Sequence, residues 1–176
     1  MTQGVARRAL GSVALGAWVA DARRAVTEEE LLATYERAWN AHDAASCAAC
    51  FAADGVREFR LRVPCRPLGL RDPRVSGRAE IADDIGRLLD AVPDLSVEVL
   101  SAAYSSDRRL WTEWRMAGTH AGDWARWRAD GRPLEVVGVS VFRLSNEGFL
   151  EERLYWDSAL ALNGGSAPGG PTNSIP

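Results

Sequence analysis

The sequence predicts an α+β fold in which a curved antiparallel sheet wraps over N-terminal helices. Helical patterns come first along the chain and a run of four strands comes last, a grouping typical of α+β rather than α/β proteins. The 176 residues fit one ordinary domain, and their composition, 47% hydrophobic and 26% charged, is that of a globular chain. A curved sheet over two or three helices leaves a hollow, which is the default place for a ligand.

The helices are predicted from apolar residues at helical spacing and from end signals. Thr27 can cap the first helix, and Glu30 completes a capping box three residues later. Pro93 ends the last helix. The predicted helices are 27–43, 44–53 and 78–92.

The strands are predicted from alternating apolar and polar residues. The segment 64–76 is predicted to be a loop because it holds three prolines. The predicted strands are 56–63, 95–103, 109–120, 133–144 and 149–157. The domain formed by these elements is predicted to span 27–162 and to be followed by a disordered tail, 163–176.

Alternation also assigns the faces of the last three strands. In strand 109–120, Glu113 and Arg115 favour water, so the other face is predicted to point into the hollow. That face carries Leu110, Thr112, Trp114, Met116, Gly118 and His120. The matching sets on the next strands are Gly138, Ser140 and Phe142, and then Glu152, Leu154 and Trp156.

Charge and the N-terminus bear on partners and location. The net charge is −3 and the arginines form no basic block, which weighs against nucleic acid as a partner. Residues 1–26 predict either a leading helix or a weak signal-like segment, with Arg7 and Arg8 before an apolar run that is too short to span a bilayer. We expect a cytoplasmic protein with no membrane partner, and export is the alternative.

Three side chains are candidates for proton transfer. His120 could move a proton near pH 7, or it could order the turn around it by local hydrogen bonds. Glu58, on the first strand, could face the pocket or pair with a neighbouring arginine. Glu152 could be a buried acid/base, or it could form a surface pair with Arg153.

Aromatic residues near the hollow predict a flat, apolar substrate, with polycyclic compounds among the candidates. Core packing is the alternative interpretation for these side chains. Trp111 and Trp127 could instead line a dimer interface. The predicted substrate-binding residues are Tyr35, Trp39, Trp114, Met116, Trp124, Ser140, Leu154 and Tyr155.

An ordered set of short motifs carries a family resemblance. The set comprises Ala38-Trp39-Asn40-Ala41-His42-Asp43, Phe51-x-x-Asp54-Gly55, Gly77-Arg78-x-x-Ile81, Gly118-Thr119-His120-x-Gly122, Asp130-Gly131-Arg132-Pro133, Gly138-Val139-Ser140-Val141-Phe142-Arg143 and Glu151-Glu152-Arg153-Leu154-Tyr155-Trp156-Asp157. Together they resemble the SnoaL-like polyketide cyclases and ester cyclases of the nuclear transport factor 2-like superfamily. The resemblance covers about 28–162. It implies a cone-shaped α+β barrel with a deep pocket, often dimeric through the outer face of the sheet.

The chain departs from this family at its acid/base positions. Leu154 stands where the cyclases carry an aspartate, and Ser140 stands where they carry a pocket histidine. Trp114 and Met116 replace the Arg-x-Asp of the related epoxide hydrolases. Ser140 and Tyr155 could still donate hydrogen bonds to an enolate.

These observations predict a cofactor-independent cyclase or isomerase, without a metal, that acts on a polyketide-like or other secondary-metabolite intermediate. Catalysis would proceed by enolisation next to a carbonyl and would form an intramolecular C–C or C–O bond. One alternative is a non-catalytic domain that binds or shapes a small molecule. Another is epoxide ring opening, which requires an inward Asp–Arg pair. A homodimer is expected.

Overall fold

The computed structural model describes residues 27–60, 74–124 and 127–156. The predictions for 1–26 and for the tail 163–176, and the end of the predicted domain, lie outside the described residues. Among the described helices, none combines the length and the apolarity that a bilayer span requires.

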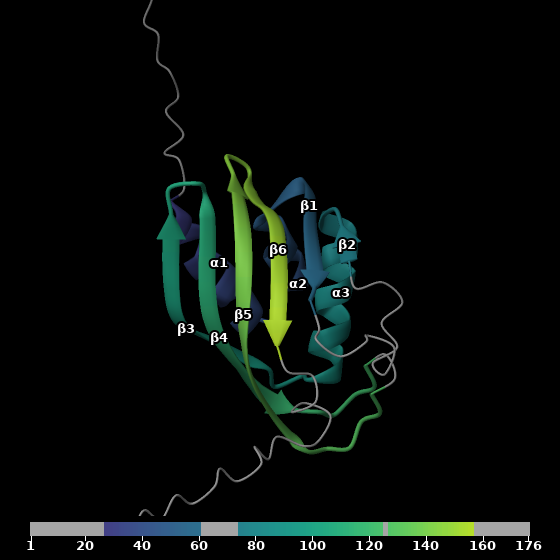
Figure 1. Ribbon diagram of the computed structural model, residues 1–176. Helices are drawn as coiled ribbons and strands as arrows, with labels where there is room; N and C mark the ends of the chain where they lie inside the picture. The colour runs from purple at the N-terminus through teal and green to yellow at the C-terminus, as the bar shows by residue number, and fades with distance from the viewer. Residues whose placement is uncertain (1–26, 61–73, 125–126, 157–176) are drawn as a thin grey trace, which may run out of the picture.

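The fold is α+β, as predicted, with an open, curved, six-stranded sheet. The three helices lie on one face of this sheet (Figure 1). The strand order across the sheet is β2-β1-β6-β5-β4-β3. In chain order the elements are α1 (Glu28–Asn40), α2 (Ala44–Ala49), β1 (Phe51–Phe59), β2 (Arg74–Ser76), α3 (Arg78–Ala91), β3 (Ser96–Ser105), β4 (Arg109–Thr119), β5 (Pro133–Ser145) and β6 (Gly148–Trp156).

The sheet is antiparallel except where β1 meets β6, which run parallel. Parallel neighbours need a long connection, and here α3 and four strands separate β1 from β6 along the chain. This pairing places the first strand second from one edge of the sheet, between β6 and the short β2 (Figure 1).

Helix α1 begins with the predicted capping box. Glu30 N–H donates to Thr27 Oγ1 over 3.1 Å, and Thr27 N–H donates to Glu30 Oε2 over 3.0 Å. The apolar stripe of the helix, which includes Tyr35 and Trp39, is buried toward the sheet. The cap thus fixes where the helix starts, and the stripe fixes which side chains it presents.

Two sequence predictions about the start of the sheet were wrong. The second helix ends at Ala49 and β1 begins at Phe51, because Phe51 is fully buried and pairs with Phe149. Gly55 lies inside the strand, and a Cβ there would come within 3.0 Å of the Phe149 carbonyl oxygen. Part of the predicted loop is β2, which pairs antiparallel with β1.

The predicted faces of β4, β5 and β6 are confirmed. The inward positions Leu110, Phe142 and Leu154 are buried, whereas Trp111 is 48% exposed on the outer face. Trp127 is buried, so it does not line an exposed interface as one interpretation allowed. Alternation was enough to assign the faces of these strands because each strand has one solvent-exposed face and one buried face.

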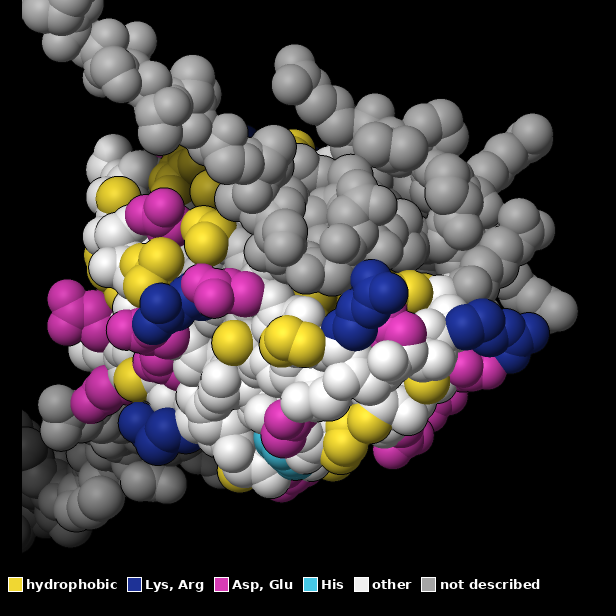
Figure 2. Space-filling model, turned by 90° about the horizontal axis from the view of Figure 1, so that it is seen from below, with side chains coloured by type: hydrophobic (Ala, Val, Ile, Leu, Met, Phe, Trp, Pro, Cys, Tyr) yellow, Lys and Arg dark blue, Asp and Glu magenta, His cyan; other side chains and the backbone are white. Residues whose placement is uncertain are grey.

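Charged side chains are spread over the surface. In the view from below, the Arg side chains stand apart from one another and beside acidic ones (Figure 2). Elsewhere on the surface arginines are also paired: Arg115 with Glu98 over 2.5 Å, and Arg109 with Asp107 over 2.9 Å. The face seen from below therefore lacks the concentrated positive charge that phosphate backbones need, as far as the described residues show.

Candidate active site

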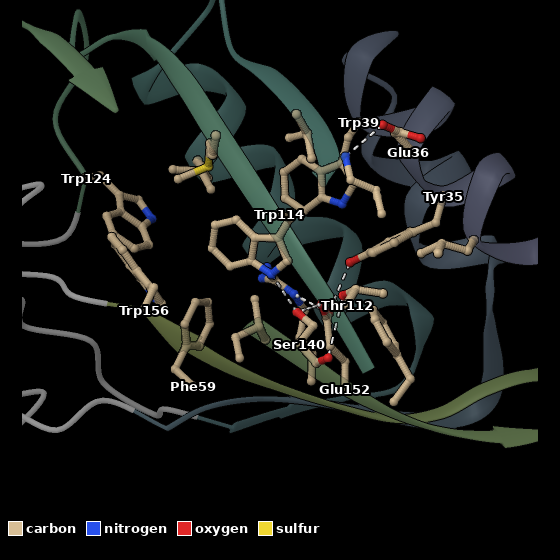
Figure 3. Close-up of a pocket in the computed structure, with 18 residues that line it drawn as sticks. Tyr35, Glu36, Trp39, Phe59, Thr112, Trp114, Trp124, Ser140, Glu152 and Trp156 are labelled. Atoms are coloured by element: carbon tan, nitrogen blue, oxygen red, sulfur yellow. Dashed lines mark hydrogen bonds and ion pairs between the residues drawn. The ribbon is translucent and has the colours of Figure 1, made fainter. Parts of the chain in front are cut away.

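A cavity lies between the inner face of the sheet and helices α1 and α3. It encloses an empty volume of about 650 Å³, including the part open to solvent. Most of its lining is apolar, and aromatic rings from α1, β1, β4, β5 and β6 converge on it (Figure 3). The aromatic lining consists of Tyr35, Trp39, Phe59, Trp114, Trp124, Phe142 and Trp156.

Glu152 is the carboxylate of the cavity that is most firmly held. Its residue is only 2% exposed, and β6 alternation turns it inward. Glu152 Oε2 accepts from Tyr35 OH over 3.0 Å and from Arg57 Nε over 3.0 Å. Glu152 Oε1 accepts from Ser140 Oγ over 2.9 Å. These donors make the charged form of the carboxylate tolerable inside an apolar cavity.

Arg57 joins two buried carboxylates. Besides Glu152 it reaches Asp84 on α3, with Arg57 Nη1 and Asp84 Oδ2 2.6 Å apart. Its guanidinium carbon lies 4.8 Å from the Phe59 ring centre and 5.5 Å from that of Trp39. Arg57 carries one positive charge and its two partners carry one negative charge each, so the three groups have one negative charge in excess. The exposed Arg87 is the next cation, and its Nη2 lies 3.8 Å from Asp84 Oδ1.

Burial and charge both act on the proton affinities around Glu152. Burial, and then the nearby charge of Glu152, raise the pKa of Tyr35 well above 10.0. For Arg57, burial lowers the pKa, but the negative charges of Glu152 and Asp84 and the hydrogen bond to Glu152 outweigh this and the net pKa is raised. At neutral pH Tyr35 thus remains a hydrogen-bond donor and Arg57 remains charged.

A second set of hydrogen bonds approaches Glu152 from β4 and β5. Trp114 Nε1 donates to Ser140 Oγ over 3.0 Å, and Ser140 in turn donates to Glu152. The Trp114 ring has room because Gly138 is its partner on β5. A Cβ at Gly138 would lie 2.3 Å from a Trp114 ring carbon. The glycine therefore sets where this indole lies.

Gly138→Ala is expected to displace the Trp114 ring and to lower the free energy of unfolding by about 1–3 kcal/mol, as overpacking does. The tryptophan fluorescence spectrum and chemical denaturation would show both effects. Gly86→Ala is the matched control, because a Cβ at Gly86 would meet its nearest neighbour only at 3.9 Å. That helix substitution should stabilise slightly. Equal behaviour of the two variants would contradict the role given to Gly138.

The structure brings eight of the eleven predicted site residues together at the cavity. Glu152 is among them, and the other seven were predicted to bind substrate. They come from α1, β4, β5, β6 and the loop after β4, which places distant parts of the chain around one space. The eight are Tyr35, Trp39, Trp114, Met116, Trp124, Ser140, Glu152 and Leu154.

His120 is not at the cavity, contrary to expectation. Its ring is 1% exposed and stacks on Trp127, with ring centres 3.6 Å apart. Nδ1 lies 3.3 Å from Asp130 Oδ1 in the loop that follows β4. The cavity is lined along β4 only as far as Met116, and His120 stands four residues further on, just past the end of β4 at Thr119, which is about 13 Å at the rise of a strand. The structure thus gives His120 a place in the loop rather than near a substrate.

Glu58 and Tyr155 also lie outside the cavity. Glu58 pairs with Arg60 over 2.9 Å, because Arg57 and Phe59 take the inward positions on β1. Tyr155 is 42% exposed on the outer face of β6. Neither side chain can reach a substrate bound in the cavity.

The sequence interpretation missed Arg57 and Asp84. A signal for Arg57 was present, because it stands two residues before Phe59 and therefore shares its face of β1. Asp84 stands one residue before Ile85 in a helix whose apolar residues are buried, but no spacing rule links it to Arg57. Among the described residues, no group of three His, Cys, Asp or Glu side chains is placed to hold a metal ion.

Burial of Cys47 and Cys50 is consistent with packing rather than reactivity. Burial raises the pKa of Cys47 to about 12 and that of Cys50 to about 11. Since the thiolate is the reactive form, both side chains are poor nucleophiles near neutral pH.

Comparison with known proteins identifies the family. The SnoaL-like domain matches residues 31–152. No match was found among curated proteins.

Three solved structures share the fold. AclR, a candidate hydroxylase from Streptomyces galilaeus, is 22% identical, with a TM-score of 0.62 over 82% of this chain and 88% of its own. A protein from Catenulispora acidiphila with a ketosteroid isomerase-like fold, in complex with trimethylamine, is 18% identical, with a TM-score of 0.64 over 81% and 96%. A candidate SnoaL-like polyketide cyclase from Jannaschia is 18% identical, with a TM-score of 0.61 over 78% and 92%.

Proposed function

This chain belongs to the SnoaL-like domain family, and on that premise we propose that it is a cofactor-independent cyclase or isomerase. It would remove and return a proton next to a carbonyl group of a small, mainly apolar substrate. Polyketide-like and other secondary-metabolite intermediates are the substrate class that we favour. Their flat rings suit an aromatic lining, and their ketones have acidic neighbouring protons.

The observation that carries the proposal is the setting of Glu152. It is an acid/base group on the cavity lining, buried and held by three donors in a mostly apolar space. Leu154 stands where the family's aspartate is expected, two residues away on the same face of β6. Glu152 thus supplies a carboxylate to the same wall from a neighbouring inward position.

The proposed reaction moves one negative charge. Glu152 takes the proton from the carbon next to the carbonyl, and the substrate becomes an enolate. Arg57 stays protonated and lies on the same lining, so its charge offsets the charge that leaves Glu152. Attack of the enolate carbon on a second carbonyl forms the ring and turns that carbonyl into an alkoxide, which takes the proton back from Glu152. Return of the proton to another carbon of the enolate gives an isomer instead.

Ser140 and Tyr155 do not serve as the enolate donors that the sequence suggested. The proton of Ser140 is committed to Glu152, and Tyr155 faces solvent.

Exchange of protons for deuterium tests the proposal without knowledge of the natural substrate. The probe is 2-tetralone, a bicyclic ketone with acidic protons beside its carbonyl, in D₂O and followed by NMR. The protein is expected to accelerate the exchange above the rate in matched buffer. A rate equal to that in buffer, with binding of the probe shown by tryptophan fluorescence, would contradict the proposal.

That last result would favour the alternative of a domain that binds or shapes a ligand without acid/base chemistry. The engagement of both Glu152 oxygens by donors within the protein is the observation that favours it. A domain that only orients a reactive substrate would also give a rate that does not change with pH. A proton transfer by Glu152 should instead fall away as the carboxylate takes a proton at low pH.

Epoxide opening is less well supported by the geometry. An Asp–Arg pair does exist, between Asp84 and Arg57, but Asp84 does not line the cavity. The carboxylates that do line it are Glu152 and Glu36, and of these two it is Glu152 that pairs with Arg57.

We also propose that the chain forms a homodimer through the outer face of the sheet. The exposed apolar side chains of this face include Leu100, Trp111, Val137, Val139 and Tyr155. Trp111→Glu should shift the protein toward monomer in sedimentation velocity, because it puts a charge within the proposed apolar interface. Asp83→Lys on the exposed side of α3 is the control and should leave the mass unchanged. A wild-type protein that stays monomeric at high concentration would overturn this proposal.

A further inference from the structure

The hydrogen bonds around Glu152 have only one consistent direction on the Ser140 side. An indole N–H can donate but cannot accept, so Ser140 Oγ must accept from Trp114 Nε1. The hydroxyl has a single proton of its own, and the side-chain acceptor that it meets among the described residues is Glu152 Oε1, at 2.9 Å. Trp114 thereby turns the Ser140 proton toward the carboxylate.

The other carboxylate oxygen is fully engaged. Glu152 Oε2 accepts from Tyr35 OH and from Arg57 Nε, each over 3.0 Å, and a carboxylate oxygen has two in-plane lone pairs. Oε1 accepts one side-chain donor and keeps one lone pair.

We infer that Trp114 and Ser140 are positioning residues, which hold Glu152 as a hydrogen-bond acceptor and leave Oε1 as the atom that takes the substrate proton. The inference rests on the proposed function of Glu152 as a base, and it adds which oxygen reacts and what controls it. Trp114 and Ser140 line the cavity beside Glu152 (Figure 3). Asp84, in contrast, is connected to Glu152 through Arg57.

If Trp114 and Ser140 only pack against their neighbours, their replacement has a different effect on the pH dependence of the rate than if they position Glu152. Loss of a donor to a carboxylate destabilises its charged form, so the carboxylate takes up a proton at higher pH. When the base becomes protonated at a higher pH, the acidic limb of the pH–rate profile shifts toward higher pH. Loss of packing alone would lower the rate or the stability but would leave the limb in place.

Three variants test the inference. Ser140→Ala removes the direct donor and should move the acidic limb of 2-tetralone exchange upward by about one pH unit. Trp114→Phe keeps an aromatic ring but removes the N–H, so it should move the limb in the same direction by less. Thr112→Val is the matched control. It removes a neighbouring hydroxyl that donates to the Ser140 carbonyl oxygen at 3.5 Å and not to the Glu152 carboxylate. The acidic limb of this variant should therefore stay at the wild-type pH, whether or not its exchange rate changes.

A second readout does not depend on activity. Infrared difference spectra of the full chain, with and without Glu152→Gln, identify the Glu152 carboxylate band, and its loss with decreasing pH is then followed in each variant. The Ser140→Ala and Trp114→Phe bands should disappear at higher pH than the wild-type band. If the wild type fails to exchange protons but the bands move as stated, the proposed function fails and the positioning stands. Bands that disappear at the wild-type pH in both folded variants would overturn the inference.

Discussion

Replacing Glu152 with Gln is expected to lower the protein-dependent rate of 2-tetralone exchange by about 100-fold or more, since a positioned general base contributes roughly 10²–10⁴-fold. Gln keeps the size of Glu152 and can still accept from Arg57 and Tyr35, but it cannot take a proton. Binding of the probe should change little, because the apolar lining is intact. The measurement is the exchange rate by NMR, with probe affinity from tryptophan fluorescence.

Glu151→Gln is the matched control for this experiment. Glu151 is the preceding residue on β6, points away from the cavity and pairs with Arg153 over 2.9 Å. Its replacement should leave the exchange rate within about twofold, because this ion pair lies on the opposite face of β6 from the cavity. Equal rates for Glu152→Gln and the wild type would remove Glu152 as the base.

The part of this site that the sequence predicted is the part built on regular strands. β4, β5 and β6 each alternate between a buried and an exposed face, so the inward positions of Trp114, Ser140 and Glu152 follow from parity. Helix α1 is equally regular, and its capping box fixes the phase that brings Tyr35 to the cavity. For these residues the local sequence pattern is enough to predict which side chains point toward the cavity.

β1 shows why the same reasoning failed elsewhere. Arginines on a strand suggest a face turned to water, and the irregular pairing between Phe51 and Val56 hides the phase of the strand. Arg57 is nevertheless inside, because Asp84 and Glu152 approach it from α3 and β6. Those partners are 27 and 95 residues away in sequence. Only the tertiary structure reveals that a buried charge has such partners.

His120 illustrates the opposite error. Parity on β4 gave its face correctly, but the distance along the strand was not considered, and the cavity ends before it. Its partner Trp127 stands in the following loop, where alternation carries no information. A strand pattern therefore predicts which way a side chain points better than it predicts what the side chain meets.

The largest expected effect on stability comes from Arg57. Arg57→Met leaves Asp84 and Glu152 as buried carboxylates without their cation, and breaking such a pair costs about 3–5 kcal/mol of the free energy of unfolding. Urea denaturation at neutral pH would measure this loss. Arg60→Met on the same segment is the control. Its side chain is 48% exposed and its pair with Glu58 should contribute less than about 1 kcal/mol.

The cause of that loss can be separated from a loss of packing. If unpaired charge is responsible, the triple variant Arg57→Met, Asp84→Asn, Glu152→Gln should recover much of the stability, because neutral groups cost less to bury than charged ones. The single variant should also lose less at low pH, where its carboxyls are neutral in the folded and unfolded states alike. A triple variant as unstable as Arg57→Met would show instead that the packing of Arg57 between Trp39 and Phe59 dominates. The two carboxylates and their shared cation would then be held for the chemistry of the cavity rather than for the stability of the fold.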